Sequence, residues 1–239
     1  DNLRAYIAYM YAHPGKKLLF MGCELAQFDE WSEEKTIGWD LLRFDKHRQF
    51  KDFSRELFQF YRDTPAMWEQ DGGWDGFDWL SCDNAEQNII SFLRRDQKGN
   101  EVIVICNFSS VTREDYRIGV PRGGRYDEIF STDAVRFGGK GTENTRIYTK
   151  QTPMHGRSCC VSLTLPAFST IYLYKKASAP KASATVEKKG TARTASKRVK
   201  AESGSKKTEN PEKTVKASTR GRAAAKKTTA ADADGTVKK

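Results

Sequence analysis

The large apolar side chains stop abruptly along this chain. Every Phe, Trp, Tyr, Leu, Ile and Met of its 239 residues lies before residue 177. A segment without such side chains cannot bury enough apolar surface to offset the entropy that it would lose on ordering. The sequence therefore predicts a folded part over residues 1–176 and a disordered tail, rich in Lys, Ala and Thr, over residues 177–239.

The charge divides at the same boundary. Residues 177–239 hold 17 basic and 6 acidic side chains, whereas residues 1–176 hold 24 basic and 25 acidic ones. The net charge of +10 therefore comes from the tail. A tail of this kind, without aromatic side chains, contacts phosphates without stacking on bases, so unspecific nucleic-acid binding is one interpretation. A solubilising extension with weak polyanion affinity is the other, and we favour it.

Cysteine usage and hydropathy exclude two classes of protein. No apolar run approaches the roughly 18–20 residues that a membrane span needs. The five cysteines are odd in number and show no CxxC spacing, which disfavours a disulfide framework and a zinc site; they are Cys23, Cys82, Cys106, Cys159 and Cys160. We expect free thiols in a reducing cytosol, and hence a cytoplasmic protein.

Residues 1–70 show the pattern of an α/β unit. An apolar stripe at helical spacing, ended by His13-Pro14-Gly15, predicts a helix; its members are Leu3, Tyr6, Ile7 and Met10. The apolar run Leu18-Leu19-Phe20-Met21 follows, and it predicts a strand buried on both faces, as in a parallel sheet. After a polar stretch from about 23 to 46, a second stripe predicts an amphipathic helix; it consists of Phe50, Phe53, Leu57, Phe58, Phe60 and Tyr61.

From residue 72 onward the pattern becomes that of an all-β domain. Asn88–Arg95 and Glu101–Phe108 flank the turn 96–100 and predict a hairpin. Further β-type runs lie around 115–120, 125–130, 159–165 and 168–174, while 132–157 reads as a long irregular loop. About seven strands in 100 residues predict an antiparallel β-sandwich.

The polar stretch after the predicted strand is the main candidate for a binding site, because ligand groups gather beyond the carboxyl end of a strand in a βα unit. It combines tryptophan with carboxylates and an amide; the candidates are Glu24, Gln27, Trp31 and Trp39. An indole can stack on the apolar face of a pyranose while polar groups hold its hydroxyls, which suits a sugar. A charged surface loop with both tryptophans packed inward is the alternative.

Several long segments resemble one family. These are HPGKKLLFMGCELAQFDEW (13–31), FDWLSCDNAEQNIISFLRRD (77–96), EVIVICNFSSVTREDYRIGVP (101–121) and VSLTLPAFSTIYL (161–173). They are similar, in the same order, to the C-terminal part of bacterial glycogen branching enzymes, in the α-amylase superfamily. One departure is Cys23, where the family usually has Asn; it places one polar contact near the sugar site in question.

The resemblance implies a fold class of α/β plus all-β. Residues 1–70 would be the C-terminal end of a (β/α)8 barrel, with its last strand and helix, and residues 77–175 the family's C-terminal all-β domain, an antiparallel β-sandwich. The tail lies outside the resemblance.

The resemblance also implies an activity, namely glucan transfer in glycogen biosynthesis. An α-1,4-glucan segment is cut, held as a covalent glycosyl-enzyme and passed to a 6-hydroxyl as an α-1,6 branch, without metal or organic cofactor. The family's catalytic carboxylates precede the matched region, so we assign no catalytic residue and expect the fragment to be inactive. Glu24, Gln27, Trp31 and Trp39 are candidates for lining the glucan cleft.

Two other functions remain open at this point. The chain could be a stand-alone α-glucan-binding or regulatory module with a basic tail, which would bind glycogen without branching it. A related hydrolase that cleaves or debranches starch is a third reading. It is disfavoured because the segments MGCELAQFDEW (21–31) and RQF…LFQFYRDTPAMW (48–68) fit branching enzymes better than amylases.

Overall fold

The computed structural model describes residues 1–177. The tail predicted to be disordered lies, from residue 178 on, outside the described residues. Two α-helices precede eight strands, namely α1 (Asn2–Ala12), α2 (Asp45–Asp63), β1 (Phe77–Asn84), β2 (Ile89–Arg95), β3 (Glu101–Asn107), β4 (Arg113–Val120), β5 (Arg125–Ser131), β6 (Ile147–Tyr148), β7 (Cys159–Leu165) and β8 (Ser169–Lys175). Five short 3₁₀ turns connect them; they are η1 (Cys23–Leu25), η2 (Trp39–Arg43), η3 (Pro65–Met67), η4 (Trp74–Gly76) and η5 (Val135–Phe137).

The strands form the predicted antiparallel sandwich. One sheet has the order β1-β2-β3-β8-β5-β6, the other is the pair β4-β7, and every strand pair among residues 1–177 is antiparallel. The predicted hairpin is confirmed as β2 and β3, and the four further β-type runs are confirmed as β4, β5, β7 and β8. The segment 132–157 is mostly irregular, as expected, but it contains η5 and β6.

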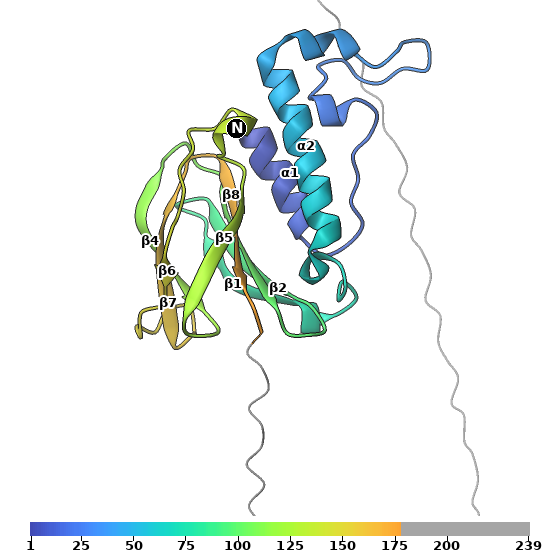
Figure 1. Cartoon of the computed structure of the whole chain (residues 1–239). Helices are drawn as coiled ribbons and strands as arrows, with labels where there is room; N and C mark the ends of the chain where they lie inside the picture. Colours follow the sequence, from blue (N-terminus) through green and yellow to red (C-terminus); the bar gives the residue numbers. More distant parts are fainter. Residues whose placement is uncertain (178–239) are drawn as a thin grey trace, which may run out of the picture. The chain divides into compact units, whose positions relative to one another are not determined.

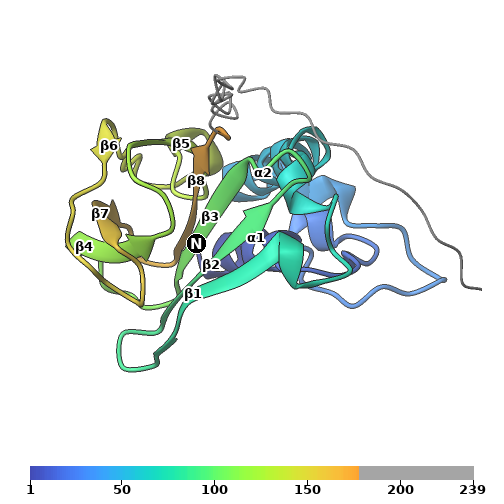
Figure 2. The same ribbon diagram turned by 90° about the horizontal axis from the view of Figure 1, so that it is seen from below.

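Strand β3 lies at the centre of the larger sheet and is buried along its whole length. Val102, Val104 and Cys106 point to the helices, whereas Ile103 and Ile105 point to the second sheet. Because successive side chains of a strand point to opposite faces, an uninterrupted apolar run suits a strand covered on both sides. Figures 1 and 2 show this arrangement, with α1 and α2 beside one face of the larger sheet and β4 and β7 beside the other.

Helix α1 ends where the sequence predicts, but it buries a different face. His13 is extended before Pro14, whose ring disfavours the helical conformation in the residue that precedes it. Of the predicted stripe, Ile7 is buried, but Leu3 is 45% exposed and Tyr6 57%. The buried face consists instead of small residues with Ile7 and Arg4, namely Ala5, Ala8 and Ala12.

Alanines on this face let the backbone of α1 approach strand β8. The carbonyl of Ala5 accepts a hydrogen bond from Thr170 Oγ1 (3.0 Å), and that of Ala8 accepts one from the Tyr172 hydroxyl (2.7 Å). Burial in this contact raises the pKa of Tyr172. Larger side chains would hold the two backbones too far apart for these bonds, which is why the bulkier stripe faces outward.

Helix α2 is the predicted amphipathic helix. Phe50, Phe53 and Leu57 are buried and share one apolar cluster with α1 and with the facing side of the larger sheet. Phe60 stacks on Phe130 of β5, with ring centroids 5.1 Å apart. The helices and the sheet therefore share one core.

The strand predicted over Leu18–Met21 is not formed within residues 1–177. These residues form no strand and pair with none among residues 1–177, and Leu18, Phe20 and Met21 are 74%, 54% and 50% exposed. An extended apolar run becomes a strand only when neighbouring strands satisfy its backbone and cover its side chains. The described sheets supply neither to this segment.

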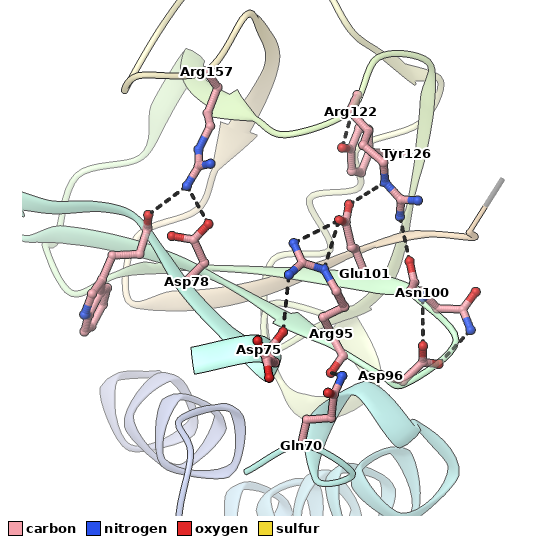
Figure 3. A network of polar contacts seen from close by, with 12 residues as sticks. Gln70, Asp75, Asp78, Arg95, Asp96, Asn100, Glu101, Arg122, Tyr126 and Arg157 are labelled. Atoms are coloured by element: carbon pink, nitrogen blue, oxygen red, sulfur yellow. Dashed lines mark hydrogen bonds and ion pairs between the residues drawn. The ribbon is translucent and has the colours of Figure 1, made fainter. Parts of the chain in front are cut away.

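Polar contacts hold the tip of the β2–β3 hairpin (Figure 3). The carboxylate of Glu101, buried at the start of β3, accepts from Arg122 Nε (2.8 Å) and pairs with Arg95 (3.3 Å). Gln70 Nε2 donates to the carbonyl of Arg95 at 3.2 Å. These bonds connect the segment after α2 with the hairpin and with the β4–β5 turn. No helix within residues 1–177 is both long enough and apolar enough to cross a membrane.

Candidate functional site

The site is formed by the loop between the exposed apolar run and α2. Leu25 of η1 is fully buried and anchors this loop. His47 Nδ1, from the first turns of α2, lies 2.7 Å from the carbonyl oxygen of Leu25, and Ser54 Oγ donates to that of Glu24 at 3.3 Å. The amphipathic helix therefore positions the loop through its polar side chains.

Gln27 closes the loop on itself. Its Oε1 accepts a hydrogen bond from the backbone N–H of Gly38 (2.8 Å), and its Nε2 donates to the carbonyl of Asp29 (2.8 Å). The amide lies so close to Gly22, which has φ +83°, that a Cβ there would come within 2.7 Å of Oε1. Glycine is thus required at this turn for both its conformation and its lack of a side chain.

A pocket of ≈ 200 Å³ lies inside this loop. It is lined by Gln27, Phe28, Asp29, Glu30, Trp31, Ser32, Lys35, Thr36, Gly38, Asp40 and Leu41. Carboxylates, a hydroxyl and an ammonium group thus stand beside aromatic faces. Such a lining can hold the hydroxyls and the apolar face of a sugar ring. We assign no nucleophile or general acid to it.

Aromatic side chains of this segment are unusually exposed. The set comprises Phe20 (54%), Phe28 (83%), Trp31 (38%), Trp39 (54%) and Phe44 (49%). Trp31 packs edge-to-face on Phe20, with centroids 5.4 Å apart, and Phe28 packs on the ring of His47 at 5.2 Å. Large aromatic groups left in water mark surfaces that a ligand or another part of a protein covers.

The structure brings together only part of the predicted site. Gln27 and Trp31 line the pocket, although the amide of Gln27 is already bonded to the backbone. Glu24 and Trp39 are not among the lining residues; the Trp39 ring lies 6.0 Å from the Lys51 ammonium. The alternative of two tryptophans packed inward is wrong for these residues, since both are exposed.

Sequence reasoning missed two aromatic residues of the site. The sequence predicts a buried strand that includes Phe20, which removes this ring from any site. Phe28 lies in the same polar stretch as the candidates, but the sugar-site interpretation there rests on the tryptophans. The spacing Phe20, Phe28, Trp31 and Trp39 within one loop was the available signal. Reading the loop by its aromatic side chains, together with its carboxylates, would have found both.

Comparison with known families defines the class of the sandwich. The family described as alpha amylase, C-terminal all-beta domain, matches residues 79–176, a range that contains nearly all of β1 and the whole of β2 to β8. The eight strands therefore form a C-terminal all-β domain of the α-amylase type.

Curated relatives match a longer part of the chain than the family does. The 1,4-alpha-glucan branching enzyme GlgB of Aquifex aeolicus is 47% identical over 174 residues, covering 72% of this chain and 28% of that protein. The enzyme of the same name from Halothermothrix orenii is 42% identical over 173 residues, with the same coverage of 72% and 28%. The chain spans little more than a quarter of these relatives and is homologous to the C-terminal region of bacterial branching enzymes.

A solved structure shows similarity at a lower level. The catalytic module of the glycogen-degrading pneumococcal virulence factor SpuA is 12% identical, with a TM-score of 0.49, over 72% of this chain and 30% of that one.

Proposed function

We propose that this chain supplies the C-terminal part of a 1,4-α-glucan branching enzyme. The observation that carries the proposal is the identity of 40–47% with branching enzymes over 173–174 residues. In this account the complete enzyme transfers an α-1,4-glucan segment to a 6-hydroxyl of glycogen, and this chain contributes no catalytic carboxylate. It is inactive alone.

Residues 1–70 are, in this proposal, the end of the catalytic barrel. The exposed run Leu18–Met21 is then the last barrel strand, and the preceding barrel strand would cover it. The outward-facing Leu3 and Tyr6 of α1 fit the same reading, because a helix of a barrel's outer ring packs on strands and on neighbouring helices. The exposure of these side chains supports the proposal, since each is an apolar surface without a partner.

The loop after this strand lines the glucan cleft in the proposed enzyme. Trp31 and Phe20 give an aromatic surface for a glucose ring, and Asp29, Glu30 and Asp40 offer acceptors for its hydroxyls. Gln27 acts by shaping the loop rather than by touching sugar, because its amide is engaged by Gly38 and Asp29. Glu24 and Trp39 remain candidates from the sequence alone.

A chimera tests this proposal. Residues 1–177 replace the matched C-terminal region of the Aquifex aeolicus relative, and new α-1,6 linkages are counted after debranching of an amylose substrate. We expect a folded chimera that branches amylose, while the 239-residue chain alone does not. A chimera with a native-like circular dichroism spectrum and thermal transition, but without new branch points, would contradict the proposal.

A second function follows from the pocket being present in the chain itself. As a stand-alone α-glucan-binding module, the chain would be retarded by glycogen in native affinity electrophoresis although it does not branch. Retardation of the chain combined with an inactive chimera would favour this module over the enzyme fragment.

Partners and location complete the proposal. α-1,4-Glucan is the proposed partner, and the tail, by its charge alone, would bind polyanions weakly. All five cysteines are free thiols, which suits a reducing cytoplasm. Binding of heparin that disappears in a variant ending at residue 177 would assign polyanion affinity to the tail.

A further inference from the structure

One arginine of the larger sheet is fully buried. Arg94 lies on the face of β2 that also carries Phe92 toward the helices, and its side chain has no exposed surface. A buried guanidinium is costly unless acceptors surround it. Its Nη1 donates to the carbonyl of Ala12 (2.6 Å), its Nε donates to that of Gly76 (3.2 Å), and its Nη2 pairs with the carboxylate of Asp71. The arginine therefore joins the end of α1, the start of β1 and the chain after η3.

Asp71 extends this contact to the turn that follows α1. Its other carboxylate oxygen accepts a hydrogen bond from the backbone N–H of Gly15 at 3.3 Å. Gly15 has φ +108°, a conformation that favours glycine, and it lies between α1 and the exposed run. Arg94 thus holds both sides of this turn, directly at the carbonyl of Ala12 and through Asp71 at Gly15.

The turn is close in sequence to the aromatic side chains of the candidate site. Leu18, the first residue of the exposed run, follows Gly15 by three residues. Within the run, the Phe20 ring packs edge-to-face on Trp31, with centroids 5.4 Å apart, and Trp31 lines the pocket. Consecutive Cα atoms keep a fixed separation of about 3.8 Å, so a shift of the turn is passed along this short stretch. The position of the aromatic pair therefore depends on where the turn is held.

We propose that Arg94 is a positioning residue for glucan binding, which holds the turn after α1 and thereby sets the place of Phe20 and Trp31. The inference rests on the proposed function, and it gives the all-β domain a part in that function. Arg94 acts through the backbone of the turn and not by contact with glucan. A guanidinium suits this role because its five N–H donors point in fixed directions and can serve three acceptors at once, whereas a lysine ammonium is a single compact charge.

A purely structural role of Arg94 is the rival explanation, and it makes a different prediction. Loss of a buried ion pair would then lower the free energy of unfolding and leave the folded enzyme unchanged. Loss of positioning instead weakens glucan binding by enzyme that is fully folded. Because the rest of the proposed enzyme supplies the catalytic carboxylates, this weakening should raise KM and leave kcat nearly unchanged.

The first measurement is amide exchange at Gly15 in the full 239-residue chain, followed by NMR. Asp71→Ala removes the acceptor of the Gly15 N–H and should accelerate its exchange at least about tenfold. Arg94→Lys should accelerate it by a smaller factor, because Asp71 then loses part of its support. Arg95→Lys is the matched control, since Arg95 is the next residue of β2 and pairs with Glu101 instead. Exchange at Gly15 that is unchanged in Asp71→Ala would overturn the proposal.

The second measurement uses the chimera with the Aquifex aeolicus relative, assayed below the thermal transition of each variant. Arg94→Lys and Asp71→Ala should raise KM for amylose at least about fivefold while kcat stays within about twofold, and Arg95→Lys should change neither constant. Asp71 is partly exposed, so Asp71→Ala tests the proposal even where the substitution of the buried Arg94 prevents folding.

The parent chimera separates the two ways of failing. An active parent chimera whose KM is unchanged in folded Asp71→Ala would overturn the positioning role and leave the proposed function intact. A folded parent chimera that does not branch amylose would overturn the proposed function, and the positioning role would fall with it.

Discussion

Two four-residue runs of this chain, both entirely apolar, have opposite fates. Val102–Ile105 forms the middle of β3 and is fully buried, whereas Leu18–Met21 belongs to no strand and is mostly exposed. The first run has β2 and β8 on its two edges and apolar layers on both faces. The second has neither among residues 1–177. The apolar side chains of a segment thus determine how much surface it can bury. Whether that surface is buried depends on the neighbouring strands and layers that are available.

The largest difference between the surroundings of the two runs should appear in the reactivity of nearby thiols. Cys106 lies in β3, fully buried, and burial raises its pKa to about 12, whereas Cys23 is exposed directly after the second run. Since the thiolate is the reactive form, labelling of Cys106 requires opening of the fold. We expect iodoacetamide to label Cys23 at least about a thousandfold faster, measured by peptide mass spectrometry. Comparable rates would mean that β3 is not the stable centre of the sheet.

Truncation of one side chain in each run should give the next largest difference. Ile103→Ala removes buried methyl groups from the sandwich and should lower the free energy of unfolding by about 2–5 kcal/mol. Leu18→Ala is the matched control and should change it by less than about 0.5 kcal/mol, because Leu18 is largely in water already. Urea unfolding followed by circular dichroism measures both. A similar loss of unfolding free energy in the two variants would mean that the two runs contribute equally to stability, which contradicts this account.

Glucan binding should depend on the exposed region and not on the sandwich. Trp31→Ala removes one face of the pocket and should weaken glycogen binding by roughly 5–30-fold, or about 1–2 kcal/mol. Trp74→Ala is the control, since Trp74 is a still more exposed tryptophan beside the β1 strand. Affinity electrophoresis over a series of glycogen concentrations gives both dissociation constants. Equal weakening by both variants would argue against a site in the loop.

A smaller effect is expected at the junction of the two regions, where Lys17 precedes the exposed run. Its pKa is about 8 in the folded chain and near 10.4 when unfolded, so the unfolded state binds more protons between these values. Stability contributed by this residue therefore rises with pH from about 8 to 10. The amine is half in solvent, which keeps the gain to roughly 1 kcal/mol or less.

The measurement is the difference in unfolding free energy between the parent chain and Lys17→Gln, taken from pH 7 to 9.5. Taking this difference cancels the contributions of other titrating groups, such as Cys106. The unfolding free energy of the parent chain should increase relative to that of the variant as the pH rises. A flat difference would show that Lys17 titrates alike in both states.

Local patterns predicted most of the fold. The period of α2, the turn between β2 and β3 and the β-type runs from 115 to 174 each specify an element by themselves, and all were confirmed. The face of α1 was not predictable in this way, because it is chosen by the close approach of Ala5 and Ala8 to β8. Strand β1 and the two-residue strand β6 both lie outside the predicted runs, and the pairing of β6 with β5 is too short to leave a pattern.

The sequence predicted where in the chain the candidate site lies, but not which side chains line it. A loop rich in aromatic and acidic residues pointed to residues 23–46, and the pocket lies there. Which side chains line it depends on hydrogen bonds over long sequence separations, such as those of Gln27 with Gly38 and His47 with Leu25. Residue types alone do not contain that information.

Hydrogen exchange tests the central claim most directly, namely that Leu18–Met21 forms a strand only when the rest of a barrel supplies its partners. Amide exchange is measured for this run and for Val102–Ile105, in the 239-residue chain and in the chimera with the Aquifex aeolicus relative. The account predicts slow exchange at 102–105 in both proteins, and fast exchange at 18–21 that becomes slow only in the chimera. Protection of 18–21 in the chain alone, or its absence in a folded chimera, would contradict the account.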